Sequence, residues 1–284
     1  MIKLAVIGHP LTQSLSSVMH NAVLKELGIE GEYETLDTEQ SDLVDRIKQM
    51  KSQGYMGFNV TIPLKVPITL FLDEVDEIAD IAGCANTVKI LPNKSLYGYN
   101  TDVYGFMTAI PSDIQAKLKG ASAAVLGTGG AARAAAIGLC KLGVKEINFY
   151  ARNVINASKM VNFLREKFYE VNFSLKQLES MTSLENNIML VNTTPVGMRG
   201  HGMGLSPIDE KFVKTLPEGA VVYDIIYNPL KTELLSYAQK NGYRLITGLD
   251  MFVHQGAKAF EIWTGKKPKI EIMKIAALEA LSGL

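Results

Sequence analysis

The sequence predicts an α/β protein with two domains, and three observations support this. Strand-like apolar runs alternate with amphipathic, helix-like stretches along nearly the whole chain, which is typical of βαβ units around parallel strands. The alternation restarts at Ala121 with a more regular spacing. At about 150 residues per domain, the 284 residues correspond to two domains, each with enough apolar material for a core.

The first third of the chain contains three expected strands, over residues 3–7, 32–36 and 56–60, with helical patterns between them. Six more expected strands follow, over 121–126, 146–150, 170–173, 188–191, 221–224 and 244–246. Six strands suit one doubly wound dinucleotide-binding sheet. The chain closes with two helical patterns and no strand, and closing helices of this kind often dock onto an earlier domain.

Composition and charge exclude several classes of protein. The 29 basic and 29 acidic residues cancel, whereas a nucleic-acid binder needs a surplus of Lys and Arg, so we expect no nucleic-acid partner. A content of 47% hydrophobic and 20% charged residues is typical of a folded protein. The first apolar run is too short for a signal peptide or a membrane span, which predicts a cytoplasmic protein with no membrane partner. The two cysteines and four histidines match no metal-ligand spacing, so no metal is expected.

A glycine-rich loop follows the expected strand 121–126 and opens a helix. It reads Gly127, Thr128, Gly129, Gly130, Ala131, Ala132 and fits the pattern GxGxxA in the context that this pattern requires. The first glycine allows a tight turn, the second lets the backbone approach a pyrophosphate, and the alanine lets helix and strand pack closely. Glycines also serve ordinary turns, but a strand before and a helix after favour a nucleotide site at the helix N-terminus.

The end of the next expected strand indicates which nucleotide binds. An NAD-binding protein usually has Asp or Glu there to accept hydrogen bonds from the ribose, whereas this chain has Ala151, Arg152 and Asn153. The planar fork of an arginine pairs well with a 2′-phosphate, which points to NADP. The alternative is a solvated surface arginine after a strand.

Polar residues beside turns are dense in the first hundred positions. Ser14 and Ser16 stand at the start of a helical pattern, where hydroxyls and free amides can hold a carboxylate, although serine there is also an ordinary N-cap. Three more groups adjoin strand-like segments: residues 59–65, 85–87 and 100–102. Each alone is compatible with turn chemistry.

Together these groups supply a cation, an anion and several neutral hydrogen-bonding side chains, which suit a small polyhydroxylated acid. Hydride delivery to a ketone places negative charge on its oxygen. An ammonium near that oxygen stabilises the charge and donates a proton, while a neighbouring carboxylate keeps the amine in place.

The ordered motifs SLS, NVTIPLK, ANT, NTDVYG, GTGGAARA, NTTPVGM, YDIIYNPLKT and GLDMFVHQGAKAFEIWTG run the length of the chain. In these the sequence resembles the shikimate dehydrogenase family. The resemblance implies a substrate-binding catalytic domain formed by residues 1–104 plus 248–284 and a Rossmann-like NADP-binding domain over 105–247. It also implies reversible reduction of 3-dehydroshikimate to shikimate by NADPH. We expect a monomer or homodimer.

The resemblance assigns roles to individual residues. It implies that Lys65 and Asp102 form the catalytic pair. Substrate-binding residues would be Ser14, Ser16, Thr61, Asn86, Tyr227 and Gln255. Besides the glycine loop and residues 151–153, cofactor contacts would include Thr193, Met198 and Gly248.

Two other functions stay open at this point. The family commonly has Asn, Arg, Thr where this chain has Ala151, Arg152 and Asn153, so a quinate or shikimate dehydrogenase that uses NAD is one alternative. A non-catalytic nucleotide or metabolite sensor on the same fold is the other, because fold alone does not establish function.

Overall fold

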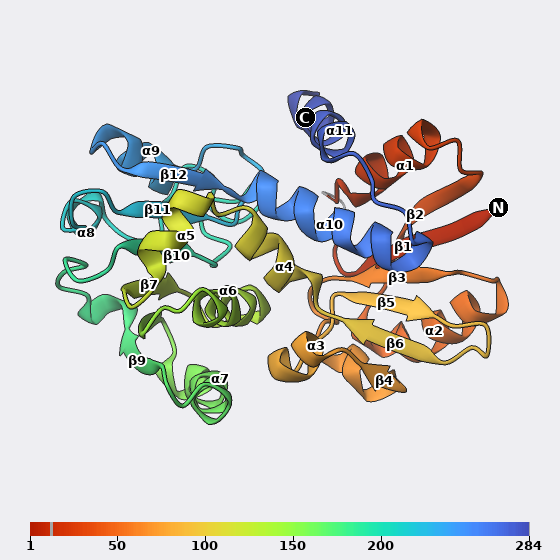
Figure 1. Cartoon of the computed structure of the whole chain (residues 1–284), viewed down its shortest axis with the longest axis horizontal. Helices are drawn as coiled ribbons and strands as arrows, with labels where there is room; N and C mark the ends of the chain where they lie inside the picture. The colour runs from red at the N-terminus through yellow and green to blue at the C-terminus, as the bar shows by residue number, and fades with distance from the viewer. Residues whose placement is uncertain (12–13, 284) are drawn as a thin grey trace. The chain divides into compact units, whose positions relative to one another are not determined.

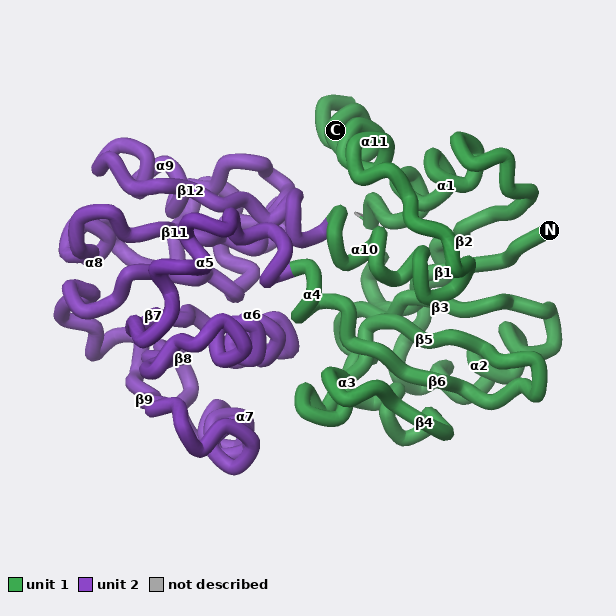
Figure 2. Tube along the Cα trace, in the orientation of Figure 1, with its two compact units in different colours: residues 1–105, 253–284 green, residues 106–252 purple. Residues whose placement is uncertain are grey.

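The computed structural model describes residues 1–11 and 14–283, and it divides into two compact units (Figure 2). Unit 1 comprises Met1–Gly105 and Val253–Leu284, and unit 2 comprises Phe106–Phe252. The two boundaries fall within helices α4 (Thr101–Thr108) and α10 (Gly248–Thr264). The elements, drawn in Figure 1, confirm the predicted α/β class.

Among its described residues, unit 1 contains a mixed six-stranded sheet in the order β2-β1-β3-β5-β6-β4. The strands are β1 (Ile2–Gly8), β2 (Gly31–Asp37), β3 (Gly57–Val60), β4 (Glu74–Val75), β5 (Thr87–Ile90) and β6 (Leu96–Tyr99). β1 pairs in parallel with β2 and β3, whereas β5 runs antiparallel to β3 and β6. The start of β5 therefore lies beside the ends of β3 and β6.

Helices cover both faces of this sheet. They are α1 (Ser16–Glu26), α2 (Leu43–Ser52), α3 (Glu77–Ala82), α11 (Ile270–Ser282) and part of α10, with 3₁₀ turns η1 (Gln40–Asp42) and η2 (Pro67–Phe71). Successive residues of β1 point to opposite faces, so Ile7 packs in the core with Leu43 of α2, and Val6 packs with Trp263 of α10.

α11 and most of α10 belong to unit 1. The indole Nε1 of Trp263 donates a hydrogen bond to the carbonyl of Val88 on β5, at 2.9 Å. Lys89 Nζ donates to the carbonyl of Ile262, at 2.6 Å. These bonds fix α10 to β5, one of the two central strands of the mixed sheet, across separations of 175 and 173 residues in the chain.

Unit 2, described throughout residues 106–252, contains a six-stranded sheet that is parallel at every pairing, in the order β12-β11-β10-β7-β8-β9. The strands are β7 (Ser122–Leu126), β8 (Glu146–Ala151), β9 (Asn172–Gln177), β10 (Met189–Asn192), β11 (Val221–Asp224) and β12 (Arg244–Thr247). This is the doubly wound order, and the strand order reverses between β7 and β10. A ligand of such a sheet binds beyond the carboxyl ends of these two strands.

The helices of unit 2 are α5 (Ser112–Leu118), α6 (Gly130–Lys141), α7 (Val154–Lys167), α8 (Glu210–Val213) and α9 (Glu233–Lys240). The connection from β9 to β10 consists of η3 (Leu178–Ser180) and a loop over residues 181–188. β9 differs from the expected strand 170–173. Pairing with β8 runs from Glu146↔Asn172 to Ala151↔Gln177, so the polar half of this edge strand pairs although its sequence is not strand-like.

Candidate active site

Lys65 and Asp102, the predicted catalytic pair, form an ion pair within unit 1. Lys65 Nζ lies 2.6 Å from Asp102 Oδ2, and the two side chains are 19% and 10% exposed. Burial by itself lowers the pKa of Lys65, but the charge of Asp102 and its hydrogen bond outweigh burial and raise that pKa above its ordinary value. Lys65 is therefore an ammonium at neutral pH with part of its surface open to a reactant.

The antiparallel part of the sheet explains why these two residues meet. Lys65 lies in the turn after β3, and Asp102 lies in the first turn of α4, directly after β6. Since β5 runs in the opposite direction between these strands, the turn before β5 reaches the same edge. The amide of Ala85 in that turn donates to the carbonyl of Lys65, at 3.0 Å.

Asn86, which also belongs to this turn, connects most of the polar groups. Its Nδ2 donates to Asp102 Oδ1 at 2.9 Å, to Thr101 Oγ1 at 3.0 Å and to Gln255 Oε1 at 3.3 Å. Its Oδ1 accepts from the amide of Thr101, at 2.7 Å. The side chain is 3% exposed. Asn86 therefore holds the carboxylate that orients Lys65, and it brings Gln255 of α10 to the same place.

The two predicted serines lie where α1 begins. Ser14 Oγ accepts a weak hydrogen bond from the amide of Ser16, at 3.4 Å, and Ser16 is the first residue of the helix. Leu15, the N-cap residue, makes no side-chain cap, so the amides that follow Ser16 in the first turn of α1 suit another acceptor. Thr61 follows β3, and its amide donates to the carbonyl of Ile7 at 2.9 Å.

Tyr227, the remaining predicted substrate residue, belongs to unit 2. Its ring stacks on Phe252, with centroids 4.5 Å apart and an interplanar angle of 23°. Burial raises the pKa of its hydroxyl to about 12, so the phenol is a neutral hydrogen-bond donor in the physiological range.

The predicted glycine loop lies at the reversal point of the parallel sheet. Gly127 follows β7 with φ +99°, and a Cβ there would stand 2.8 Å from Oγ1 of Thr193, which follows β10. A Cβ on Gly129 would meet nothing within 4 Å, so the backbone is open on that side. Gly129 is the N-cap of α6 and has no side chain to occupy the first amides. Thr128 completes the turn, Gly130 and Ala131 are the first residues of α6, and Ala132 is fully buried.

These features fit a dinucleotide. The open backbone beside Gly129 leaves room for a pyrophosphate, and the free amides and positive end of α6 suit its charge. Arg152 is exposed directly after β8, where an arginine can reach a 2′-phosphate, and Ala151 is buried at the end of the strand. Asn153 has a role that the sequence analysis missed, because its side chain caps α7 by accepting from the amide of Asn156 at 3.0 Å.

Three further predicted cofactor residues belong to unit 2. Thr193 Oγ1 donates to the carbonyl of Leu126, at 2.6 Å, which joins the ends of β10 and β7. Met198 pairs with His201 in an isolated antiparallel bridge. Gly248 starts α10, and a Cβ there would lie 2.0 Å from the carbonyl oxygen of Ile225, so only glycine fits.

Sequence analysis also missed a buried carboxylate, Asp224, at the end of β11. It accepts from Asn192 Nδ2 at 3.0 Å and from Thr232 Oγ1 at 2.6 Å, and burial raises its pKa to about 6. Asn192 Oδ1 in turn accepts from the amide of Thr194, at 2.9 Å. This network fixes the loop after β10. The motifs NTTPVGM and YDIIYNPLKT carry these residues, but spacing alone does not reveal that they meet.

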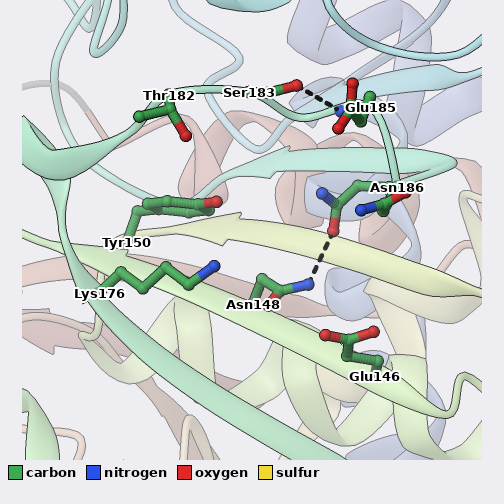
Figure 3. A pocket seen from close by; sticks show the side chains of 9 residues that line it. Glu146, Asn148, Tyr150, Lys176, Thr182, Ser183, Glu185 and Asn186 are labelled. Atoms are coloured by element: carbon green, nitrogen blue, oxygen red, sulfur yellow. Dashed lines mark hydrogen bonds between the residues drawn. The ribbon is translucent and has the colours of Figure 1, made fainter.

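A polar hollow of about 190 Å³ lies elsewhere in unit 2, on one face of β8 and β9 (Figure 3). Alternate residues of β8 line it, because successive side chains of a strand point to opposite faces of the sheet. The loop between β9 and β10 forms the other side of the hollow. Asn148 Nδ2 donates to Asn187 Oδ1 across the hollow, at 3.0 Å. None of the predicted site residues is among the residues that line it, which are Glu146, Asn148, Tyr150, Lys176, Thr182, Ser183, Glu185, Asn186 and Asn187.

Two searches of the described residues limit the other kinds of site. Within residues 1–11 and 14–283, three or more His, Cys, Asp or Glu side chains nowhere gather in an arrangement that could hold a metal ion. No helix in that part of the chain combines the length and the apolar character that a membrane crossing requires.

Comparison with known proteins identifies the family of this chain. The family model described as shikimate dehydrogenase substrate binding domain matches residues 6–88, and the model described as shikimate 5'-dehydrogenase C-terminal domain matches residues 248–278. A shikimate dehydrogenase (NADP(+)) from Bacillus cereus is 39% identical over 279 residues, which cover 98% of each chain.

Solved structures give the same result. The shikimate 5-dehydrogenase of Thermus thermophilus, crystallised with NADP(H) and shikimate, is 36% identical with a TM-score of 0.84, over 99% of this chain and 100% of that one. A quinate dehydrogenase from Corynebacterium glutamicum, in complex with NAD, is 28% identical with a TM-score of 0.87, over 98% and 99% of the two chains. The 39% identity to a curated relative over 98% of each chain, with family models that match residues 6–88 and 248–278, shows that this chain belongs to the shikimate dehydrogenase family.

Proposed function

We propose that this chain catalyses the reversible reduction of 3-dehydroshikimate to shikimate with NADPH as the reductant. The observation that carries the proposal is the Lys65–Asp102 ion pair, held by Asn86 at one edge of the mixed sheet. The pair provides a proton donor of raised pKa beside a fixed anion, which is what reduction of a ketone to an alcohol requires of the protein.

When bound, the nicotinamide supplies a hydride to the ketone carbon. Lys65 stabilises the negative charge that develops on the ketone oxygen and donates a proton to it, so that one hydride and one proton convert the carbonyl to a hydroxyl. Lys65 then regains a proton from solvent. In the oxidation direction the neutral amine removes the hydroxyl proton, and Asp102 keeps the amine in place throughout.

The other predicted residues of unit 1 suit the rest of the substrate. The hydroxyls of Ser14 and Ser16 and the free amides of α1 are donors for a carboxylate. Thr61, Asn86 and Gln255 offer neutral groups for ring hydroxyls, and Tyr227 offers a neutral phenol. We propose these six as the substrate-binding residues.

The proposed cofactor is NADP, held by residues 127–132 and 151–153 with Thr193, Met198 and Gly248. The open backbone at Gly129 and the exposed guanidinium of Arg152 support this choice. The curated relative named for NADP(+) and the Thermus thermophilus complex support it independently.

An absorbance assay of NADPH oxidation in the presence of 3-dehydroshikimate tests the proposal. We expect turnover with this pair and, in the reverse direction followed as NADPH formation, faster oxidation of shikimate by NADP+ than of quinate, or than of shikimate by NAD+. Absence of oxidation at every pH would refute the proposed reaction and favour a binding protein that retains the fold. A monomer or homodimer in the cytoplasm remains our expectation for the assembly and location.

A second candidate is a quinate or shikimate dehydrogenase that uses NAD. The observation in its favour is the pair of residues that flank Arg152, because Ala151 is buried and the side chain of Asn153 caps α7. The similarity to the Corynebacterium glutamicum quinate dehydrogenase points the same way. Preference for quinate with NAD in the same assay would establish this candidate and exclude the first.

A further inference from the structure

Tyr33 of β2 is held on every side within unit 1, and it is 1% exposed. Its amide donates to Asn21 Oδ1 at 2.8 Å, and its carbonyl accepts from Asn21 Nδ2 at 2.9 Å. Its ring stacks on His20, with centroids 4.3 Å apart and an angle of 8° between the planes. The position of the phenol is therefore fixed by its own backbone and by its neighbours.

The hydroxyl of Tyr33 points to the network that holds the catalytic pair. It donates to Asn59 Oδ1, at 2.7 Å, in a buried hydrogen bond. Asn59 Nδ2 then donates to the carbonyl of Asn86 at 3.1 Å and to Thr87 Oγ1 at 3.0 Å. Since Asn86 binds Asp102, two side chains connect the phenol to the proposed chemistry.

On its other side Tyr33 meets the helix that carries the proposed carboxylate site. His20 and Asn21 of α1 both contact Tyr33, and Ser16 lies one helical turn before His20, on the same face of the helix. Burial raises the pKa of Tyr33 well above its usual range, against the opposite effect of the nearby Ser16 hydroxyl. The phenol thus stays protonated and remains a donor to Asn59.

We infer that Tyr33 is a positioning residue. Its hydroxyl fixes the position of Ser16, and of the substrate carboxylate that Ser16 binds, relative to Asn86 and the catalytic pair. The inference rests on the proposed function. The hydroxyl touches no reacting atom. His20 and Asn21 tie Tyr33 to α1, and the hydroxyl joins Tyr33 through Asn59 to the turn before β5. Loss of the Tyr33 hydroxyl weakens binding of the substrate carboxylate and leaves proton transfer by Lys65 intact.

The test is Tyr33→Phe, which removes one oxygen and keeps the stacked ring. The loss of one hydrogen bond predicts a rise in KM for shikimate of about three- to tenfold, with kcat and KM for NADP+ within about twofold of wild type. The effect should nearly vanish when the substrate is shikimate methyl ester, because the ester lacks the charge that Ser16 holds. It should also shrink in a Ser16→Ala background, because the two changes affect one interaction.

Tyr55→Phe is the matched control. Tyr55 is another buried tyrosine of unit 1, and its hydroxyl donates to Glu34, outside the network. We expect its kinetics to match wild type. Asn59→Ala removes the same bond from the acceptor side and should raise KM for shikimate at least as much, which keeps the test available if Tyr33→Phe folds poorly.

Two results would overturn the inference: an unchanged KM for shikimate in Tyr33→Phe, or an equal loss with the acid, the ester and the Ser16→Ala background. The second result would indicate a general loosening of unit 1. Failure of the wild-type protein to reduce NADP+ with shikimate would instead refute the proposed function, so the two failures are distinguishable.

Discussion

Replacement of Lys65 by Met is the sharpest test of the proposed chemistry. Met keeps most of the length and the apolar stem of the lysine but removes the ammonium that lies 2.6 Å from Asp102. A positioned general acid is worth about a hundredfold to ten-thousandfold, so the activation free energy should rise by about 2.7 to 5.5 kcal/mol. Asp102 keeps its hydrogen bond from Asn86, so its orientation should survive.

The same change also costs stability, and the structure bounds that cost. Removal of one partner of a fully buried ion pair destabilises a protein by about 3 to 5 kcal/mol. Lys65 is 19% exposed and Asp102 is 10% exposed, so we expect a value at the low end of that range. A loss of about 3 kcal/mol leaves a domain of ordinary stability folded.

The assay follows NADPH oxidation at saturating 3-dehydroshikimate, with NADPH binding measured separately by its fluorescence. Lys89→Met is the matched control, because Lys89 is a partly buried lysine of unit 1 that binds the carbonyl of Ile262 and lies outside the proposed site. We expect turnover near wild type for the control and unchanged NADPH binding for both variants. Turnover of the Lys65→Met variant above roughly a tenth of wild type would refute the assigned role.

Three further predictions concern charge. In Asp102→Asn, burial acts on Lys65 without the opposing carboxylate and lowers the pKa of Lys65. The acid limb of the pH profile for shikimate oxidation should therefore move to lower pH. An unmoved limb would show that this limb does not report the titration of Lys65. Arg152→Ala should weaken NADP binding roughly ten- to hundredfold and change NAD binding little, as measured by titration; an equal effect on both would show that Arg152 does not bind the 2′-phosphate. His20, whose pKa burial lowers from 6.5 to about 3, takes up a proton below pH 6.5 in the unfolded chain but not in the native one, so wild-type stability should fall by about 2 kcal/mol from about pH 7 to about pH 5. In His20→Phe, the free energy of unfolding measured with urea should lack this part of the fall. An identical pH dependence in both proteins would show that His20 does not cause it.

The sequence predicts unit 2 better than unit 1, for a physical reason. Buried parallel strands are continuous apolar runs, so β7, β8, β10, β11 and β12 stand out from the helices between them. β5 and β6 are short strands with tyrosine and lysine among their residues, and no expected strand covers them. β9 pairs through polar residues at the sheet edge, where burial places little demand on side-chain type.

The candidate site is predictable in its residue types and not in its connections. Polar groups beside turns indicate where chemistry is placed, and the glycine loop indicates a phosphate site at a helix start. That Asn86 joins Asp102 to Gln255 depends on an antiparallel strand and on the return of α10, neither of which a local pattern encodes. For the same reason the contacts of Tyr33 and Asp224 emerge only from the fold.

Unit 1 consists of two chain segments, and this has a consequence for synthesis on the ribosome. Unit 2 is continuous and can fold once residue 252 has emerged, whereas the catalytic half must wait for residues beyond 253. Until Trp263 and its helix arrive, the face of β1 that carries Leu4 and Val6 has no cover from α10. The half that would perform the chemistry is thus completed last, and until then its early-made sheet leaves apolar side chains uncovered.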